Sequence, residues 1–77
     1  MTELAELMPG ERGRVCGFHK GNPEYKQRLL AMGFTPNTEF TVIRKAPLGD
    51  PIQVEVRNFQ LSLRKKEAEF LRIERVL

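Results

Sequence analysis

The sequence has few of the residues on which enzymes and metal centres are built. Among 77 residues it holds one cysteine, one histidine, one tyrosine and no tryptophan. A single cysteine cannot form an internal disulfide, which fits a reducing compartment. There is no Ser/His/acid set and no Cys/His pair with an orienting third group. We therefore expect no enzymatic activity and no bound cofactor.

Long apolar stretches are also absent. No run approaches the roughly 20 residues that cross a bilayer, and the acidic start MTELAELMPGE lacks the apolar core of a signal peptide. We expect a soluble, cytoplasmic protein without direct membrane insertion. The 13 basic and 10 acidic residues give a net charge of +3, well mixed along the chain. Nucleic-acid binders usually gather basic residues on one face and interleave aromatics, so no nucleic-acid partner is expected.

The length predicts one domain over residues 1–77. A chain of this size buries about 60–65% of its unfolded surface, and its core supplies on the order of 3–5 kcal/mol of net stability. Such a domain has no room for an active site several layers deep, which leaves its surface as the place for function.

The clearest local signal is one short helix. Asn22 can cap it, and Pro23 suits the first helical position. Gly33 is placed to end it in the left-handed conformation. Tyr25, Leu29 and Met32 form an apolar stripe at positions i, i+4 and i+7 of this helix. Leu30 lies at the edge of the stripe.

Alternating apolar residues predict five short strands around that helix. A bulge at Gly17 would turn Val15 and Phe18 inward together. In the turn after the helix, Asn37 can adopt a positive φ. The strands are expected at Gly13–His19, Glu39–Lys45, Ile52–Val56, Phe59–Leu63 and from Leu71, with one helical turn over Lys65–Glu69.

A two-residue turn at Arg57-Asn58 makes the register of one hairpin predictable. It would pair Val56 with Phe59 and place Ile52, Val54, Leu61 and Leu63 on one apolar face. Five short strands with one helix predict an all-β fold, a small five-stranded barrel that is closed or nearly closed. We expect the helix to plug one end of it.

Four ordered motifs make the chain resemble a known family from about Met8 onward. The motifs are Leu29-Leu30-x-Met32-Gly33-Phe34-x-Pro36, Ala46-Pro47-Leu48-Gly49-Asp50-Pro51-Ile52, the Val56-Arg57 hairpin and Leu61-x-Leu63-Arg64. In this order and spacing they resemble the FeoA family, small cytosolic accessory proteins of bacterial ferrous iron uptake. Asn37 and Asn58 stand where that family more often has glycine, and asparagine is the next most tolerant residue for φ > 0.

The resemblance implies an SH3-like barrel and a role without chemistry. FeoA-like proteins work with FeoB, an inner-membrane iron transporter that carries a cytosolic GTP-binding domain. The partner implied here is therefore a FeoB-type transporter, met on its cytoplasmic side, with peripheral placement at the inner membrane through that partner. A second interpretation is a stand-alone, metal-responsive regulator related to the SH3-like domain of iron-dependent repressors.

The loop Pro47-Leu48-Gly49-Asp50-Pro51 is the candidate partner-binding site. Turn chemistry accounts for its prolines and glycine, with Gly49-Asp50 making the turn. It does not account for apolar Leu48 at the apex. A stiff loop with one anchor loses little entropy on binding, so we expect the loop to dock together with the neighbouring helix end at Leu30 and Met32. The rival interpretation folds Leu48 back onto the barrel end.

Other chemistry has weaker support in the sequence. Cys16 and His19 could share one face at the bulge, but a ferrous iron site needs more ligands, so we expect no metal site. Arg44, Arg57 and Arg64 lie at strand ends, where an arginine that assists GTP hydrolysis could project. Binding of proline-rich peptides needs an aromatic-lined groove, which one tyrosine does not supply.

Overall fold

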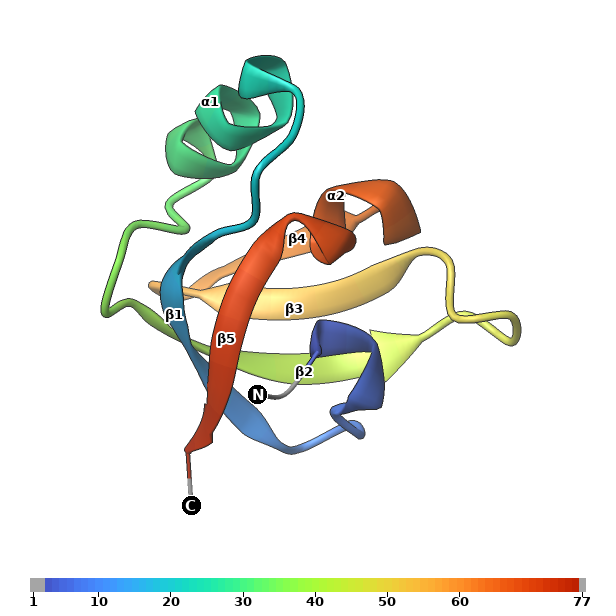
Figure 1. Ribbon diagram of the computed structural model, residues 1–77. Helices are drawn as coiled ribbons and strands as arrows, with labels where there is room; N and C mark the ends of the chain where they lie inside the picture. Colours follow the sequence, from blue (N-terminus) through green and yellow to red (C-terminus); the bar gives the residue numbers. More distant parts are fainter. Residues whose placement is uncertain (1–2, 77) are drawn as a thin grey trace.

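The five strands form one curled antiparallel sheet that makes a small, incompletely closed barrel (Figure 1). The computed structural model describes residues 3–76. The strand order is β4-β3-β2-β1-β5, and within the described residues no ladder joins β4 to β5. The sequence predicted a barrel that is either closed or nearly closed, and the structure shows the nearly closed form. The strands are β1 Arg12–Phe18, β2 Glu39–Lys45, β3 Ile52–Val56, β4 Phe59–Leu63 and β5 Leu71–Val76.

The helix α1 (Pro23–Ala31) forms where the caps predict it. The side chain of Asn22 accepts a hydrogen bond from the Glu24 N–H at 2.9 Å. At the other end Gly33 has φ +104°, and the Phe34 N–H donates to the Leu29 carbonyl at 3.0 Å. This is the Schellman motif, in which a residue in the left-handed conformation turns the chain so that the N–H groups at the helix end can donate to carbonyls of its last turn. None of the described helices is long and apolar enough to span a membrane.

Two shorter helical segments accompany it. The turn α2 (Lys65–Glu69) links β4 to β5 as predicted, and it packs against a 3-10 turn, η1 (Leu4–Glu6), which the sequence did not predict. Leu4 and Leu7 of the N-terminal segment are fully buried, so this segment contributes to the core. The core as a whole consists of Leu4, Leu7, Val15, Leu29, Phe34, Phe40, Val42, Ile52, Val54, Val56, Leu63, Ala68, Leu71 and Ile73.

The hairpin of β3 and β4 has the predicted register. Val56 pairs with Phe59, and the turn residues Arg57 and Asn58 have φ +51° and +72°, as a two-residue type I′ turn requires. The expected bulge in β1 is also present, since the pairing with β5 shifts between Val15 and Gly17.

Phe59 corrects one sequence-based expectation. Although its backbone pairs as predicted, its side chain is 71% exposed and takes no part in the core. It is the first residue of β4, one of the two edge strands of the sheet, next to the hairpin turn. Alternation fixes the direction of a side chain but cannot tell whether other residues cover it.

The helix α1 lies beyond one end of the sheet (Figure 1). Leu29 is its fully buried residue. Tyr25 stacks on Phe70, with ring centroids 4.7 Å apart and planes inclined by 10°. The Arg28 guanidinium lies 3.3 Å from the Glu67 carboxylate in α2. These contacts join α1 to the segment that precedes β5.

Candidate docking site at the proline loop

The loop between β2 and β3 begins with a tight turn. The Gly49 N–H donates to the Ala46 carbonyl at 2.7 Å, with Gly49 at φ +77°, so that Pro47 and Leu48 occupy the middle of the turn. The turn therefore lies two residues before the predicted Gly49-Asp50 position. Proline at the second position of a turn explains this, because its fixed φ suits that place.

Leu48 lies at the apex of this turn and is 91% exposed. The alternative in which it folds back onto the barrel end is therefore wrong. Single exposed leucines are common on protein surfaces and need no special explanation. Here the leucine is carried by a turn whose base is held on both sides, and this combination makes it a candidate anchor.

Two contacts brace the base of the loop. The Asp50 carboxylate accepts a hydrogen bond from the Lys65 N–H at 3.1 Å, at the first residue of α2. The Lys45 ammonium donates to the carbonyl of Ala5 in η1. The Ala46 N–H also donates to the Pro51 carbonyl at 3.0 Å, extending the pairing of the strands. The loop is thus fixed to both short helical segments.

A hollow of about 290 Å³ opens beside the braced loop. Its apolar part includes Ile52, Leu4 and Ala68, which are almost completely buried. Charged residues of α2, and Glu3 just before η1, complete the lining. The residues involved are Glu3, Leu4, Ala5, Ile52, Lys65, Ala68 and Glu69. We call the loop Pro47–Pro51 and this hollow together the loop face.

The structure does not bring the helix end to the loop face. Leu30 and Met32 are half-buried at the C-terminal end of α1, whereas the loop lies at the opposite end of the β2–β3 hairpin (Figure 1). Gly33 lies next to Val56, the last residue of β3, while the loop leads into Ile52, the first. The expectation that loop and helix end adjoin is therefore wrong, because the length of the hairpin separates them.

The two candidate metal ligands do not gather further partners. Cys16 is exposed, and the His19 Nε2 lies 3.9 Å from the Glu3 carboxylate. Among residues 3–76 no three His, Cys, Asp or Glu side chains come together as a metal would require. The described side chains therefore offer no basis for proposing a metal site here.

Two of the three candidate arginines are engaged on the protein surface. Arg57 donates to the hydroxyls of Thr35 and Thr38 at 3.1 and 3.4 Å, joining two turns. Arg44 donates to the Gln53 side chain of the neighbouring strand at 3.2 Å. Arg64 is the N-cap residue directly before α2. Arg57 and Arg44 thus have structural partners.

Sequence reasoning missed the contribution of the N-terminal segment to the loop face. Leu4 and Ala5 line the hollow, and the Ala5 carbonyl receives the Lys45 side chain. The spacing of Leu4 and Leu7 is compatible with one helical turn, but three residues are too few for periodicity to identify it.

Comparison with known proteins gives a consistent result. The family model described as the FeoA domain matches residues 2–75. A curated relative from Porphyromonas gingivalis, the Fe(2+) transport protein A/Fe(2+) transporter FeoB fusion protein, is 31% identical over 71 residues. That match covers 92% of this chain but only 8% of the fusion protein.

Solved structures agree with the fold. The FeoA-like protein of Clostridium acetobutylicum superimposes with a TM-score of 0.86 at 34% identity, covering 100% of this chain and 92% of that chain. FeoA of Stenotrophomonas maltophilia, solved with zinc and described as a prokaryotic SH3 domain protein, gives 0.81 at 26% identity, covering 96% and 91%. The SH3-like architecture is thereby confirmed.

This chain also resembles a manganese-dependent transcriptional repressor, but only in its fold. Its TM-score is 0.87 at 14% identity, with 97% of this chain and 36% of the repressor chain covered. At such low identity the shared barrel carries no statement about function.

Proposed function

This chain belongs to the FeoA family, and on that premise we propose that it is a non-enzymatic accessory protein of ferrous iron import that docks on a FeoB-type transporter. Family membership links the chain to ferrous iron transport. The proposal adds the partner, a membrane transporter with a GTP-binding domain, and a cytoplasmic location peripheral to the inner membrane through that partner.

The fusion protein of Porphyromonas gingivalis is the main observation that supports this proposal. There a segment 31% identical to this chain is part of one polypeptide with an iron transporter. Two modules in one chain stay at high effective concentration, which favours even weak contact between them. Because this chain matches only 8% of that protein, transport itself is not assigned to it.

The loop face is the docking surface that the geometry favours. A turn braced by Asp50 and Lys45 holds Leu48 in place before any partner arrives, so little conformational entropy is lost on binding. The adjacent hollow can receive an apolar side chain of the partner. A contact by Leu30 and Met32 would be a second one, at the other end of the hairpin.

Binding of the purified protein to a detergent-solubilised, full-length FeoB-type transporter tests the proposal. The isolated GTP-binding domain is run in parallel, with and without nucleotide. Binding to the full-length transporter is expected, and the parallel measurement shows whether the GTP-binding domain suffices. Absence of binding to both, under every nucleotide condition, would contradict the accessory role.

A matched pair of variants tests the loop face within that assay. Leu48→Ser removes the exposed anchor, whereas Met8→Ser removes another exposed apolar side chain that is not part of the loop face. We expect Leu48→Ser to weaken binding about tenfold, equivalent to about 1.4 kcal/mol, with unchanged melting. Met8→Ser should bind like the parent protein. Equal affinities for both variants would exclude Leu48 as an anchor while leaving the accessory role intact.

The alternative of a metal-responsive regulator receives no functional support from the repressor likeness, which is a likeness of fold. Within residues 3–76 the α-helices are α1, with nine residues, and α2, with five. Neither resembles the paired helices that insert into the major groove of DNA. The accessory role therefore stands as the proposed function.

A further inference from the structure

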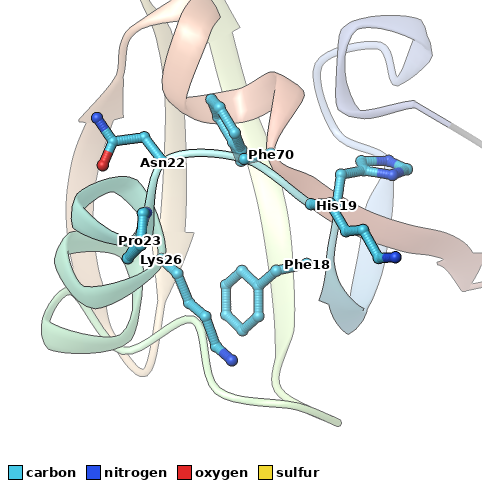
Figure 2. A pocket seen from close by; sticks show the side chains of 8 residues that line it. Phe18, His19, Asn22, Pro23, Lys26 and Phe70 are labelled. Atoms are coloured by element: carbon cyan, nitrogen blue, oxygen red, sulfur yellow. The ribbon is translucent and has the colours of Figure 1, made fainter.

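A second hollow, of about 400 Å³, lies where the end of β1, the start of α1 and the residue before β5 meet (Figure 2). Phe18 comes from the end of β1, Lys26 from α1, and Phe70 from the turn that leads into β5. These elements lie at the α1 end of the barrel (Figure 1), and the hollow borders the loop face, since His19 of its lining lies 3.9 Å from Glu3 of the other hollow. We call it the Phe18–Phe70 hollow.

Close packing fixes the wall of this hollow at Phe70. The Phe70 ring is stacked on Tyr25, and its carbonyl accepts a hydrogen bond from the His19 N–H at 2.8 Å. A Cβ atom at Gly21 would lie 1.8 Å from Cε1 of Phe70, so the chain can rest on this ring only because residue 21 is glycine. The aromatic wall therefore exists before any ligand binds.

The polar part of the lining is basic. The Lys26 ammonium lies 5.8 Å from the centre of the Phe18 ring, and Lys20 is exposed beside it. Among residues 3–76 no acidic residue lines the hollow, although the Glu3 carboxylate lies 3.9 Å from the His19 imidazole. Two lysines beside two phenylalanines make a surface with positive charge over apolar rings.

This combination identifies the ligand by its chemistry. An apolar side chain would cover the two phenylalanine rings, while neighbouring carboxylates would pair with Lys20 and Lys26. A volume of about 400 Å³ lies at the lower end of the range for ligand sites, about 300–1,000 Å³, which suits a short segment. We propose that the Phe18–Phe70 hollow binds an acidic peptide segment with a large apolar side chain beside its carboxylates. This inference goes beyond the proposed function, since it requires neither the loop face nor the transporter.

Titration of the ¹⁵N-labelled protein with defined peptides, followed by NMR, tests the proposal. The probe is acetyl-Glu-Asp-Phe-Asp-Glu-amide. A second peptide replaces its phenylalanine with glycine, and a third replaces its four acidic residues with lysine. We expect saturable shifts of the amides of residues 18–26 and 70–71 with the probe, with about tenfold weaker binding of the glycine peptide and none of the lysine peptide. Added salt should weaken probe binding.

Charge-reversal variants separate the hollow from general attraction to a basic protein. The double variant Lys20→Glu/Lys26→Glu should weaken binding of the probe at least about tenfold. A matched control, Lys65→Glu/Lys66→Glu, reverses the same number of charges at two exposed lysines of α2 outside the hollow and should leave binding unchanged. The ¹⁵N spectrum of each variant checks that it is folded. Shifts elsewhere on the barrel, equal binding of the lysine peptide, or an unaffected double variant would each overturn the proposal.

Discussion

Replacement of Glu67 should destabilise this protein mainly through one backbone hydrogen bond. Glu67 lies in α2 and has only 5% of its surface exposed. Its carboxylate accepts the Arg64 N–H at 2.9 Å and lies 3.3 Å from the Arg28 guanidinium. The first contact stabilises the start of α2, and the second joins α2 to α1.

The two contacts should contribute unequally. A hydrogen bond to a charged acceptor contributes about 1.5–3 kcal/mol. The Arg28 side chain is 59% exposed, so solvent screening limits its ion pair to about 0.5 kcal/mol. We therefore expect Glu67→Ala, which removes both contacts, to lower the free energy of unfolding by about 2 kcal/mol or more. For a domain whose net stability is on the order of 3–5 kcal/mol, this is a large fraction.

Thermal and urea denaturation of three variants would measure these contributions. Glu67→Gln keeps an oxygen that can accept the Arg64 N–H, so it should lose only about 0.5–1 kcal/mol. Arg28→Ala removes the ion pair and should lose about 0.5 kcal/mol or less. The melting temperature of Glu67→Ala should fall by about 10 °C, since one kcal/mol corresponds to about 4–8 °C at this size.

Two results would refute this account. If Glu67→Gln destabilised the protein as much as Glu67→Ala, the charge rather than the acceptor would determine the effect. If Glu67→Ala lost less than about 0.5 kcal/mol, water would replace the hydrogen bond without cost.

Substitutions at three further positions test the packing and the turns, each by urea denaturation. Gly13→Ala would place a Cβ atom 2.6 Å from Cζ of the buried Phe40, and overpacking should cost about 1–3 kcal/mol; an unchanged midpoint would mean that the ring moves freely. Gly33→Ala has room for its Cβ atom, but the alanine must adopt φ +104°, so we expect the free energy of unfolding to fall by about 1–2 kcal/mol. Gly33→Asn should lose less, because asparagine tolerates positive φ better than alanine. Asn58→Ala, at φ +72°, should lose about 1 kcal/mol, whereas Asn58→Gly should be close to neutral, and the reverse order would contradict the type I′ turn.

Local structure was predictable where the residues that determine it lie within the same short segment of sequence. The helix α1 begins at Asn22 and Pro23 and ends at Gly33 because these residues satisfy or terminate the backbone by themselves. The hairpin register followed from turn length together with alternation, because a two-residue turn permits only one pairing of Val56 and Phe59.

Exposure and proximity were not predictable in the same way. Alternation assigned Phe59 to the apolar face, but whether a side chain is covered depends on segments distant in sequence. The expected grouping of Leu48 with Met32 failed for the same reason, since the β2–β3 hairpin holds them at opposite ends. The candidate site was thus half predictable: its loop could be identified from the sequence, but its neighbours could not.

The sequence by itself determined the five strands, α1 and α2, their order, the positive φ of Gly33, Asn37 and Asn58, and the family to which the chain belongs. The tertiary structure decided which surfaces these elements form together. It set Leu48 at the apex of a braced turn beside the hollow of η1 and α2, and it brought Phe18 and Phe70 into the lining of one second hollow. Helices and turns depend on residues that are neighbours in the sequence, so the sequence pattern reveals them. A surface joins residues that are distant in the sequence and become neighbours only when the barrel folds.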